Sequence, residues 1–408
     1  MFRSFLIGVL IFLAGILAVL LLMLFMTPVY DFPRPEPFAG ENISNPYEKM
    51  DSLAWRKTNF HFHTRAWFGL TSGRNNTTKA FWSTYGKLGY DVPCISDYMS
   101  INAFNKDSVF YIPVYEHGFG VRKKHHILIG AKKVLWYDYS LYQNIHNKQH
   151  ILDLLRDQSE IVAIAHPDWE NGFSCDDMKY LSNYDLLEVL DNNWRSVPQW
   201  DAALSSGHPV FILADDDAHD IADPYEVGRC ATFINSPTRD ATSMMRALKE
   251  GRAYGVDLFM GDNYTFEQKA KDAKTLAYPV SVRVKRDTLF VAMSDSVVRF
   301  KFIGQDGRCM KYSFFGKTAW YRIRPEDSYI RTEIVTYNQY RYAGSVIYLN
   351  PVYRYQDTKP DNSMRAEVNF ARTWIFRLCS IPALLSLILI WYYRRKRASA
   401  KKHEKDAV

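Results

Sequence analysis

Apolar residues follow three different patterns along the chain, and each pattern predicts a different kind of element. Two long runs, Phe5 to Met26 and Trp374 to Tyr393, contain almost no charged residues. Between Trp55 and Val256, short apolar runs alternate with stretches typical of helices, such as Asn147 to Gln158. Strands alternating with helices predict an α/β domain with parallel strands. After Val256, apolar and polar residues alternate over short runs, which predicts a β-sandwich.

These patterns divide the chain into six segments. The segments are a transmembrane helix at 5–26, a linker at 27–54, an α/β domain at 55–256, a β-sandwich-like domain at 257–366, a second transmembrane helix at 374–393 and a basic cytoplasmic tail at 394–408.

The first apolar run is long enough to cross a membrane. Phe5 to Met26 carries no charged residue, and at about 1.5 Å per residue it spans a hydrocarbon core of about 30 Å. The alternative is a cleaved signal peptide, whose apolar region has about 7–15 residues before a small-residue cleavage site. Because this run is longer and ends in Met26-Thr27-Pro28, an uncleaved anchor is favoured.

The second apolar run predicts the orientation of the protein in the membrane. Arg377 lies near one end of the run, where its side chain can reach the interface, and Arg394 to Arg397 follow it directly. Such a basic cluster favours the cytoplasmic side. A nucleic-acid or lipid-binding patch is the alternative. Because the cluster directly follows an apolar span, its role in fixing the membrane orientation is favoured. Both termini are therefore expected in the cytoplasm, with the domains between them periplasmic or at the cell surface.

Charge and cysteine usage narrow the classes of function. Much of the net charge of +7 lies in the last segment, from Arg394 onward, so the domains have no clustered nucleic-acid footprint. Four cysteines lie between the two spans: Cys94, Cys175, Cys230 and Cys309. They form no CxxC motif, and their spacing selects none of the three possible pairings. Free buried thiols are expected.

Possible metal ligands follow the apolar runs of the α/β domain. In His61-Phe62-His63 the two imidazoles are two residues apart, so in a strand they point to the same face. Asp217-Ala218-His219 repeats this spacing. Three other possible metal ligands each lie at or near a further apolar run: Glu116, His126 and His166. An isolated buried histidine is more often a hydrogen-bonded core residue, but several strands ending in ligands indicate one shared site.

These motifs resemble those of the PHP (polymerase and histidinol phosphatase) family of metal-dependent phosphoesterases. They occur in the family's order between positions 61 and 220: His61-Phe62-His63-Thr64, Ile95-Ser96-Asp97-Tyr98, Pro113-Val114-Tyr115-Glu116, His126-Ile127-Leu128, Ala165-His166-Pro167 and Asp217-Ala218-His219-Asp220. The resemblance implies a distorted (β/α)7 barrel with two or three metal ions at the C-terminal face of its strands.

The resemblance also implies which residues bind each ion. The first ion would have four ligands: His61, His63, Glu116 and Asp217. The second would share Glu116 and add His126 and His166, with His125 as the alternative to His126 if the register shifts by one.

The resemblance implies a third metal set made of His219 and a second histidine, but this set is incomplete in this sequence. Its usual histidine is replaced by Tyr98, and the position that resembles an SDG motif contains Thr71-Ser72-Gly73. His219 is then expected to hold phosphate or donate a proton, and Asp97 to accept a hydrogen bond behind the ligands.

Mixed nitrogen and oxygen ligands suit Zn, Mn or Fe, and a pair of such ions can activate water and neutralise a phosphoryl group. Arg65 and Arg195 are candidates to clamp phosphate, although most arginines are solvated surface groups. The expected activity is hydrolysis of a phosphate monoester or phosphodiester in a small molecule or polymer. The alternatives are an inactive metal- or ligand-binding module and a structural role in envelope assembly; the retained ligands favour the enzyme.

Overall fold

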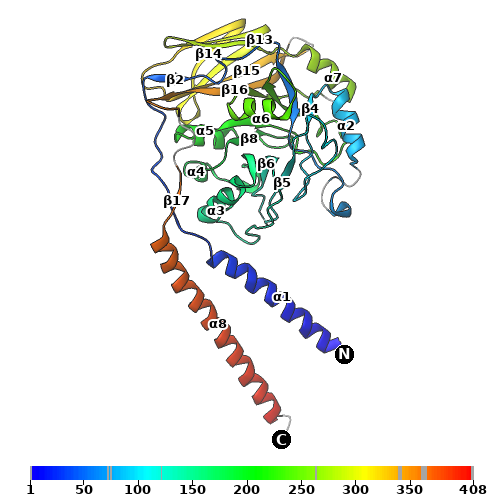
Figure 1. Cartoon of the computed structure of the whole chain (residues 1–408), viewed down its shortest axis with the longest axis vertical. Helices are drawn as coiled ribbons and strands as arrows, with labels where there is room; N and C mark the ends of the chain where they lie inside the picture. The colour runs from blue at the N-terminus through cyan, green and yellow to red at the C-terminus, as the bar shows by residue number, and fades with distance from the viewer. Residues whose placement is uncertain are drawn as a thin grey trace.

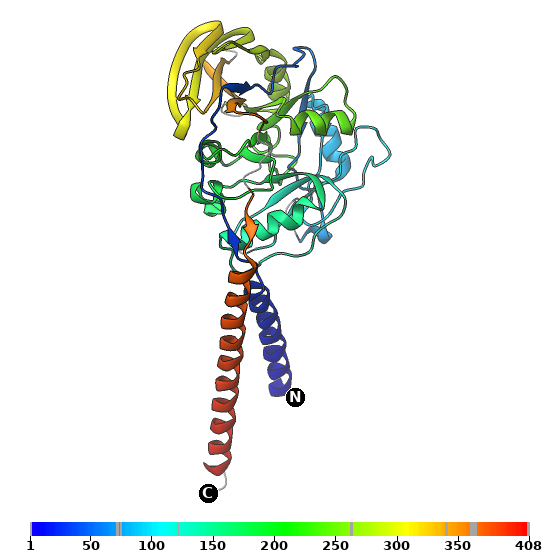
Figure 2. The ribbon, with the colours of Figure 1, turned by 60° about the vertical axis from the view of Figure 1, so that its left-hand side comes forward.

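Two long helices leave a globular body at the same end, in a computed structural model that describes residues 2–70, 73, 76–120, 122–261, 264–338, 342–359 and 365–405. These helices are α1 (Phe2–Phe25) and α8 (Phe370–Lys405), as Figures 1 and 2 show. From Phe5 to Phe25, α1 is long and apolar enough to cross a membrane, a test that a signal sequence also passes. Within the described part of the chain only α1 passes it, so the second span at 374–393 stays a prediction.

One sheet of the body is short and buried. Its strands, in spatial order, are β5 (Val114–His117), β6 (His126–Ala131), β7 (Ser159–Ile164), β8 (Leu186–Leu190) and β9 (Phe211–Ala214). The pairs β7–β8 and β8–β9 are parallel, whereas β5–β6 and β6–β7 are antiparallel. Because nearly every residue of these strands is buried, they are read in the sequence as continuous apolar runs rather than alternating ones.

The second sheet runs through both predicted domains. Its strands are β3 (Trp55–Asn59), β4 (Val92–Pro93), β10 (Cys230–Asn235), β11 (Ala253–Asp257), β12 (Pro279–Lys285), β13 (Thr288–Gly304), β14 (Arg308–Arg322), β15 (Tyr329–Tyr337), β16 (Ala343–Tyr355) and the short β2 (Asn42–Ser44). Strand β11 pairs antiparallel with β16, with Tyr254 opposite Leu349. The strands expected as a separate β-sandwich therefore extend the sheet of the α/β domain, although they enclose a hydrophobic cluster of their own around Phe300 and Ile334.

The two sheets meet at the strand ends that carry the predicted ligands. Isolated parallel bridges join Phe62 to Ala218 and Tyr98 to Glu116. In the described residues no continuous ladder closes the strands into a barrel, so the barrel stays a prediction, and the structure shown is a mixed α/β arrangement.

Helices cover the sheets. They are α2 (Thr78–Lys87), α3 (Ile145–Arg156), α4 (Cys175–Met178), α5 (Val197–Ser205), α6 (Ala241–Lys249) and α7 (Phe266–Thr275), with short 3-10 turns η1 (Trp67–Gly69), η2 (Trp169–Asn171) and η3 (Gln305–Gly307). Helix α3 begins in a capping box between Asn144 and Asn147, and it buries Ile151 and Leu155 in the main core.

The segment expected as a linker, 27–54, is packed against the body. Its β1 (Tyr30–Asp31) pairs with β17 (Glu367–Val368). The ring of Phe38 stacks on Tyr353, and the buried Tyr47 hydroxyl donates to the Ala253 carbonyl at 2.6 Å. These contacts hold the segment in place along its length.

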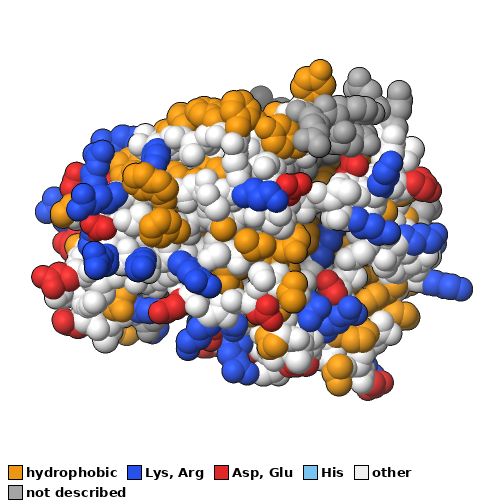
Figure 3. All heavy atoms as spheres, turned by 90° about the horizontal axis from the view of Figure 1, so that it is seen from above, with side chains coloured by type: hydrophobic (Ala, Val, Ile, Leu, Met, Phe, Trp, Pro, Cys, Tyr) orange, Lys and Arg blue, Asp and Glu red, His pale blue; other side chains and the backbone are white. Residues whose placement is uncertain are grey.

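The four cysteines between α1 and α8 are free, as expected, but only Cys94 and Cys230 are buried, while Cys175 and Cys309 are exposed. On the end of the body far from the two helices, Lys and Arg side chains are spread among acidic and apolar ones (Figure 3).

Candidate metal centre

Two histidines enter the site from the residues that follow β3. His61 and His63 are both buried, and Phe62 between them points the other way, as the alternation of an extended chain requires. Phe62 packs on Phe81 of α2 with 4.6 Å between ring centroids. The apolar residue of the motif therefore anchors it to a helix, while the two imidazoles face the site.

Glu116 of β5 lies at the centre of the site and is fully buried. Four imidazole nitrogens surround its two carboxylate oxygens. The distances to Oε1 are 2.6 Å from His125 Nδ1, 3.2 Å from His166 Nε2 and 3.4 Å from His61 Nε2, and Oε2 lies 3.2 Å from His63 Nε2. One carboxylate thus faces nitrogens from three separate segments of the chain.

Asp217, which follows β9, is the second central carboxylate. Its Oδ1 lies 3.1 Å from His61 Nε2 and 3.2 Å from His63 Nε2. The Asp217 backbone has a φ of 46°, in the left-handed region where a residue with a side chain is strained. Such strain often accompanies functional sites. Here the backbone N–H of Asp217 donates to the His61 carbonyl at 2.9 Å.

These residues form groups that could hold metal ions. The ligand atoms lie within 4.8 Å of one another in each of four overlapping groups: His61, His166 and Asp217; His61, His63 and Glu116; His63, Asp217 and His219; and Glu116, His125 and His166. Three buried atoms that face the cluster have nitrogen or oxygen neighbours within 3.4 Å, but the directions of these contacts do not suit hydrogen bonds: His61 Nε2, Glu116 Oε2 and His125 Nδ1. Buried polar atoms without partners are costly, and bound metal ions would satisfy them.

His125, rather than His126, stands beside Glu116. His126 is the first residue of β6 and His125 precedes it. Their rings have different surroundings because adjacent residues in an extended chain face opposite sides. The His126 ring lies 5.5 Å from the Phe173 ring, and neither of its nitrogens has a hydrogen-bond partner. Burial lowers the pKa of His126 well below its usual value. The structure therefore places the alternative residue in the second ligand set and His126 in the packed interior.

Glu188 is a member of the site that the sequence motifs did not single out. It lies in the middle of β8, is fully buried, and its Oε1 is 2.8 Å from His61 Nδ1. Its Oε2 accepts from the His166 backbone N–H at 2.7 Å. Carboxylates in this position fix the orientation of metal-binding histidines. The sequence does contain a signal for Glu188, because it is an acidic residue inside an otherwise apolar strand.

Asp97 supports the site from behind through one neighbour. Its Oδ1 accepts from the Thr64 backbone N–H at 2.7 Å, and its Oδ2 accepts from the Thr64 hydroxyl at 2.7 Å. Because Thr64 directly follows His63, these bonds fix the end of the histidine motif.

The third group combines His219 with His63 and Asp217. The ring Nδ1 of His219 donates to the Asp217 carbonyl at 2.7 Å, which leaves Nε2 for a ligand. The Tyr98 ring stacks on His63, with 4.4 Å between centroids and an angle of 19°. Thr71 and Ser72, at the position expected to resemble the SDG motif, lie outside the described residues.

The two arginines expected to clamp phosphate differ in position. Arg195 is bound to Asp257, with Nε–Oδ2 and Nη2–Oδ1 distances of 2.7 and 2.8 Å, so its guanidinium already has a bidentate partner. Arg65 is exposed and lines an open groove of about 370 Å³ together with Thr64, Trp67, Asp97 and Asn102. Of these two arginines, Arg65 is the one available to a substrate.

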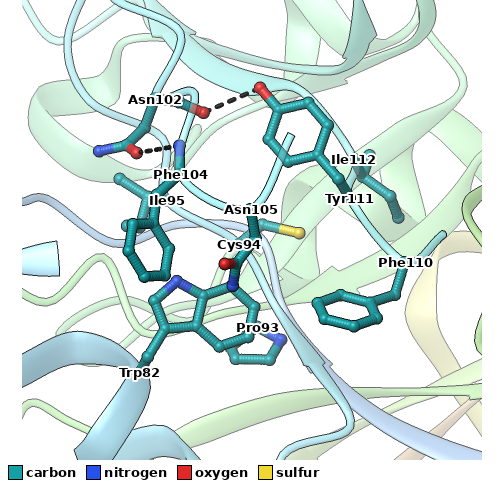
Figure 4. Close-up of a pocket in the computed structure, with 10 residues that line it drawn as sticks. All are labelled: Trp82, Pro93, Cys94, Ile95, Asn102, Phe104, Asn105, Phe110, Tyr111 and Ile112. Atoms are coloured by element: carbon teal, nitrogen blue, oxygen red, sulfur yellow. Dashed lines mark hydrogen bonds between the residues drawn. The ribbon is translucent and has the colours of Figure 1, made fainter. Parts of the chain in front are cut away.

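A second cavity near Asn102 is much smaller than the groove at Arg65, and neither is lined by residues of the four metal-binding groups. It has a volume of about 20 Å³ and is lined by residues including Trp82, Cys94 and Phe110 (Figure 4). The Tyr111 hydroxyl donates to the Asn102 carbonyl at 2.8 Å at its edge. This volume suits about one water molecule, so the groove at Arg65 is the better candidate for substrate.

Charges in the site are strongly coupled. Burial opposes ionisation of Glu116, but His125 and His61 hold its pKa well below the usual value. Burial also opposes a charge on His61, but the surrounding carboxylates, Asp217 first, raise its pKa well above the usual value. In the same way, the hydrogen bond to Asp217 and the nearby charge of Glu116 outweigh burial and raise the pKa of His63 to about 9. Metal binding would displace these protons.

Neither a protein-family model nor a curated protein matches the chain. Among solved structures, the chain is similar to a two-domain protein from Bacteroides vulgatus that contains a predicted PHP-like metal-dependent phosphoesterase. The identity is 12%, the TM-score is 0.36, and the match covers 78% of this chain and 99% of that chain. A similarity at this level leaves the function to be inferred from the site, which is a buried cluster of histidines and carboxylates suited to metal ions.

Proposed function

We propose that the protein is a metal-dependent phosphoesterase of the PHP type, which hydrolyses a phosphate monoester or phosphodiester with two divalent transition-metal ions. The observation that carries this proposal is the position of Glu116, whose two oxygens both face imidazole nitrogens. A carboxylate placed in this way could be a ligand of two metal ions at once. The nitrogen and oxygen donors favour Zn, Mn or Fe.

The residues that would hold each ion follow from the groups. One set would join the group of His61, His63 and Glu116 with Asp217, whose Oδ1 lies 3.1 and 3.2 Å from Nε2 of His61 and His63. The other would be the group of Glu116, His125 and His166. When bound, such ions supply an activated water and neutralise the charge that develops on a phosphoryl group. His63, Asp217 and His219 offer a third set, which would lack the usual histidine at Tyr98.

The chain's own groups then have separable roles. Glu188 accepts a hydrogen bond from Nδ1–H of His61, so that Nε2 of the ring faces the site. His219 has Nε2 free and is 31% exposed at its side chain, so it can hold phosphate or protonate the leaving oxygen. Arg65 can bind phosphate from the groove through its guanidinium.

The test is hydrolysis by the full-length chain in detergent. The protein is stripped with a chelator, reloaded with Mn²⁺ or Zn²⁺, and assayed with 4-nitrophenyl phosphate and bis(4-nitrophenyl) phosphate. We expect activity only after reloading, and much less in Glu116→Gln. Metal that binds without any hydrolysis on a wider panel of esters would favour the alternative, an inactive binding module.

We also propose that α1 anchors the protein, that a second span follows the body, and that the body lies outside the cytoplasm. The basic residues Arg394 to Arg397 support this orientation. A reporter that is active only in the cytoplasm should be active when fused after Val408. If it is active only when exported, the orientation is wrong.

A further inference from the structure

The globular body begins directly at the end of α1. Met23 and Leu24 of that helix pack against the main hydrophobic core. Two residues beyond the helix, the Thr27 hydroxyl accepts from Asn147 Nδ2 of α3 at 2.7 Å. Arg377 of α8 donates to the Met26 carbonyl at 2.7 Å. Both helices therefore reach the body at one place and without a stalk, as Figures 1 and 2 show.

This junction places one end of the body at the membrane surface. The 24 residues of α1 extend over roughly 36 Å at about 1.5 Å per residue, close to the hydrocarbon thickness of about 30 Å. If α1 spans the bilayer, its last turn lies at the interface. Because that turn contacts the core, the adjoining surface of the body lies at the same depth.

The segment between β6 and α3 adjoins the junction. The Tyr139 hydroxyl is 2.7 Å from Nδ1 of His150, in the helix that also binds Thr27. In this segment the side chains of Trp136 and Tyr142 are 61% and 60% exposed. Phe119 lies alongside, because its backbone N–H donates to Asp138 at 2.9 Å.

The same segment is bonded to the strand that carries Glu116. The Leu135 backbone N–H donates to the Tyr115 hydroxyl at 3.0 Å, and the His117 ring donates from Nε2 to the Tyr137 carbonyl at 3.0 Å. Both neighbours of Glu116 thus hold this segment, which connects the metal centre to the membrane end of the body.

A second exposed turn continues the surface to the edge of the site. The Trp67 ring packs edge-on against Trp136 at 5.7 Å, and its Nε1 donates to the Tyr98 carbonyl at 2.8 Å. Beside it, Phe68 and Leu70 are 94% and 87% exposed. We call the exposed residues of these segments the apolar rim: Trp67, Phe68, Leu70, Phe119, Trp136 and Tyr142.

An apolar rim of this kind is unusual on a surface that faces only water. Tryptophan and tyrosine favour the membrane interface, where an apolar ring and a polar edge are both accommodated. Trp67 belongs to the rim and also lines the groove at Arg65. A phosphate group at the bilayer surface would therefore meet the groove directly.

We infer that the apolar rim rests on the bilayer and that the substrate is a phosphate ester carried by a membrane lipid. This inference rests on the proposed phosphoesterase activity and names its substrate class. In the reaction, water oxygen bonds to phosphorus, the bond from phosphorus to the ester oxygen breaks, and that oxygen leaves as an alcohol after taking a proton. Arg65 binds the phosphate in the groove while the acyl chains stay in the membrane.

The test uses the full-length chain in vesicles of phosphatidylcholine, loaded with Mn²⁺. Hydrolysis is measured for two lipids in the vesicles, phosphatidic acid as a monoester and phosphatidylglycerol as a diester, and for the soluble 4-nitrophenyl esters. The rim variant is Phe68→Ser with Leu70→Ser. The matched control is Leu53→Ser with Phe315→Ser, which removes two apolar side chains that are 82% and 73% exposed elsewhere.

We expect the wild type to cleave at least one of the two lipids. The ratio of lipid to soluble-ester turnover should fall at least tenfold in the rim variant and stay unchanged in the control. Cleavage of soluble esters without any cleavage of lipid would overturn the inference and leave the phosphoesterase proposal intact. An unchanged ratio in the rim variant would also overturn it. Failure on every ester after metal loading would refute the phosphoesterase proposal itself.

A second readout reports contact without turnover. Lipids brominated near the headgroup quench tryptophan fluorescence on contact, and Trp136→Phe should reduce the quenched fraction relative to the wild type. Equal quenching in the two proteins would show that Trp136 does not touch the bilayer, which contradicts the inference.

Discussion

His125 and His126 are identical in chemistry and adjacent in sequence, but their rings have different surroundings. His125 Nδ1 lies 2.6 Å from Glu116, whereas the His126 ring packs against Phe173. We predict that His125→Ala lowers metal content and activity. His126→Ala should retain both but cost about 2–4 kcal/mol of stability, because it removes a buried ring.

Elemental analysis and thermal unfolding of the two variants test this difference. If His126→Ala loses metal while His125→Ala keeps it, the second ligand set has been assigned to the wrong histidine.

Glu116 and His219 should differ in the same assays. Glu116→Gln replaces an oxygen that faces imidazole nitrogens, so metal content and turnover should fall together. His219→Asn should lower turnover by about 10²–10⁴-fold, the loss expected for a proton donor, with metal content close to that of the wild type. Metal content and kcat of both variants test this difference between a metal ligand and a proton donor. Full activity in Glu116→Gln would exclude a bridging role.

Much of the ligand set could be predicted from residue spacing. The i, i+2 spacing of His61 and His63 follows from strand geometry, and the structure brings both to Glu116. The choice between His125 and His126 could not be made, because two adjacent histidines fit either register and only β6 pairing decides which one faces the site. Arg195 could not be assigned because its partner, Asp257, is distant in the sequence.

At the scale of elements, the sequence predicts strands more readily than their partners. Alternation between Val280 and Tyr337 correctly indicated strands, but it carried no information that β16 would pair with β11. A sheet that continues from one predicted domain into the next depends on long-range pairing. The packing of segment 27–54 also depends on long-range contacts. Its proline and acid content suggested a linker, although Tyr47 is buried.

The contact between α5 and β15 provides a test at this scale. Arg331 is 2% exposed and binds both oxygens of Asp201 at 2.7 Å. Removal of Asp201 leaves Arg331 buried with Glu333 as its remaining partner, 2.7 Å from Nη1, so the expected cost lies at the lower end of the about 3–5 kcal/mol of a broken buried ion pair. We predict that Asp201→Ala is destabilised by this amount, with metal content unchanged because the pair lies outside the metal groups.

Urea unfolding measures the stability of Asp201→Ala, and Asp176→Ala is the matched control because its pair with Lys179 is exposed and contributes about 0–1 kcal/mol. Equal stability of the two variants would show that the pair between α5 and β15 does not hold the two parts of the body together.

For the whole molecule, the site predicts a pH dependence of the metal-free protein. The pKa of His63 is raised to about 9 from an ordinary value of 6.5, so the folded state binds more protons than the unfolded state between these values. The resulting stability is complete below pH 6.5 and is lost as the pH rises through 9. Histidines with lowered pKa, such as His126, change stability only below pH 6.5 and do not affect this window.

Thermal unfolding after chelation should therefore show a midpoint that falls between pH 6.5 and about 8. Above that pH, Lys57, Lys124 and Lys269 oppose the fall, because burial lowers their pKa values to about 8. In the metal-loaded protein the fall should be smaller, because the ions replace the protons. A midpoint that rises over this lower range in the chelated protein would contradict the charge arrangement of the site.

The most direct test of the central claim is a titration of activity against metal. Full-length protein stripped of metal is supplied with increasing Mn²⁺ or Zn²⁺, and hydrolysis of a phosphate ester is followed at each step. The two ligand sets that share Glu116 predict activity that rises from near zero and reaches a plateau at about two ions per chain. Activity that is unaffected by chelation, or that never appears at any metal concentration, would contradict a two-metal phosphoesterase.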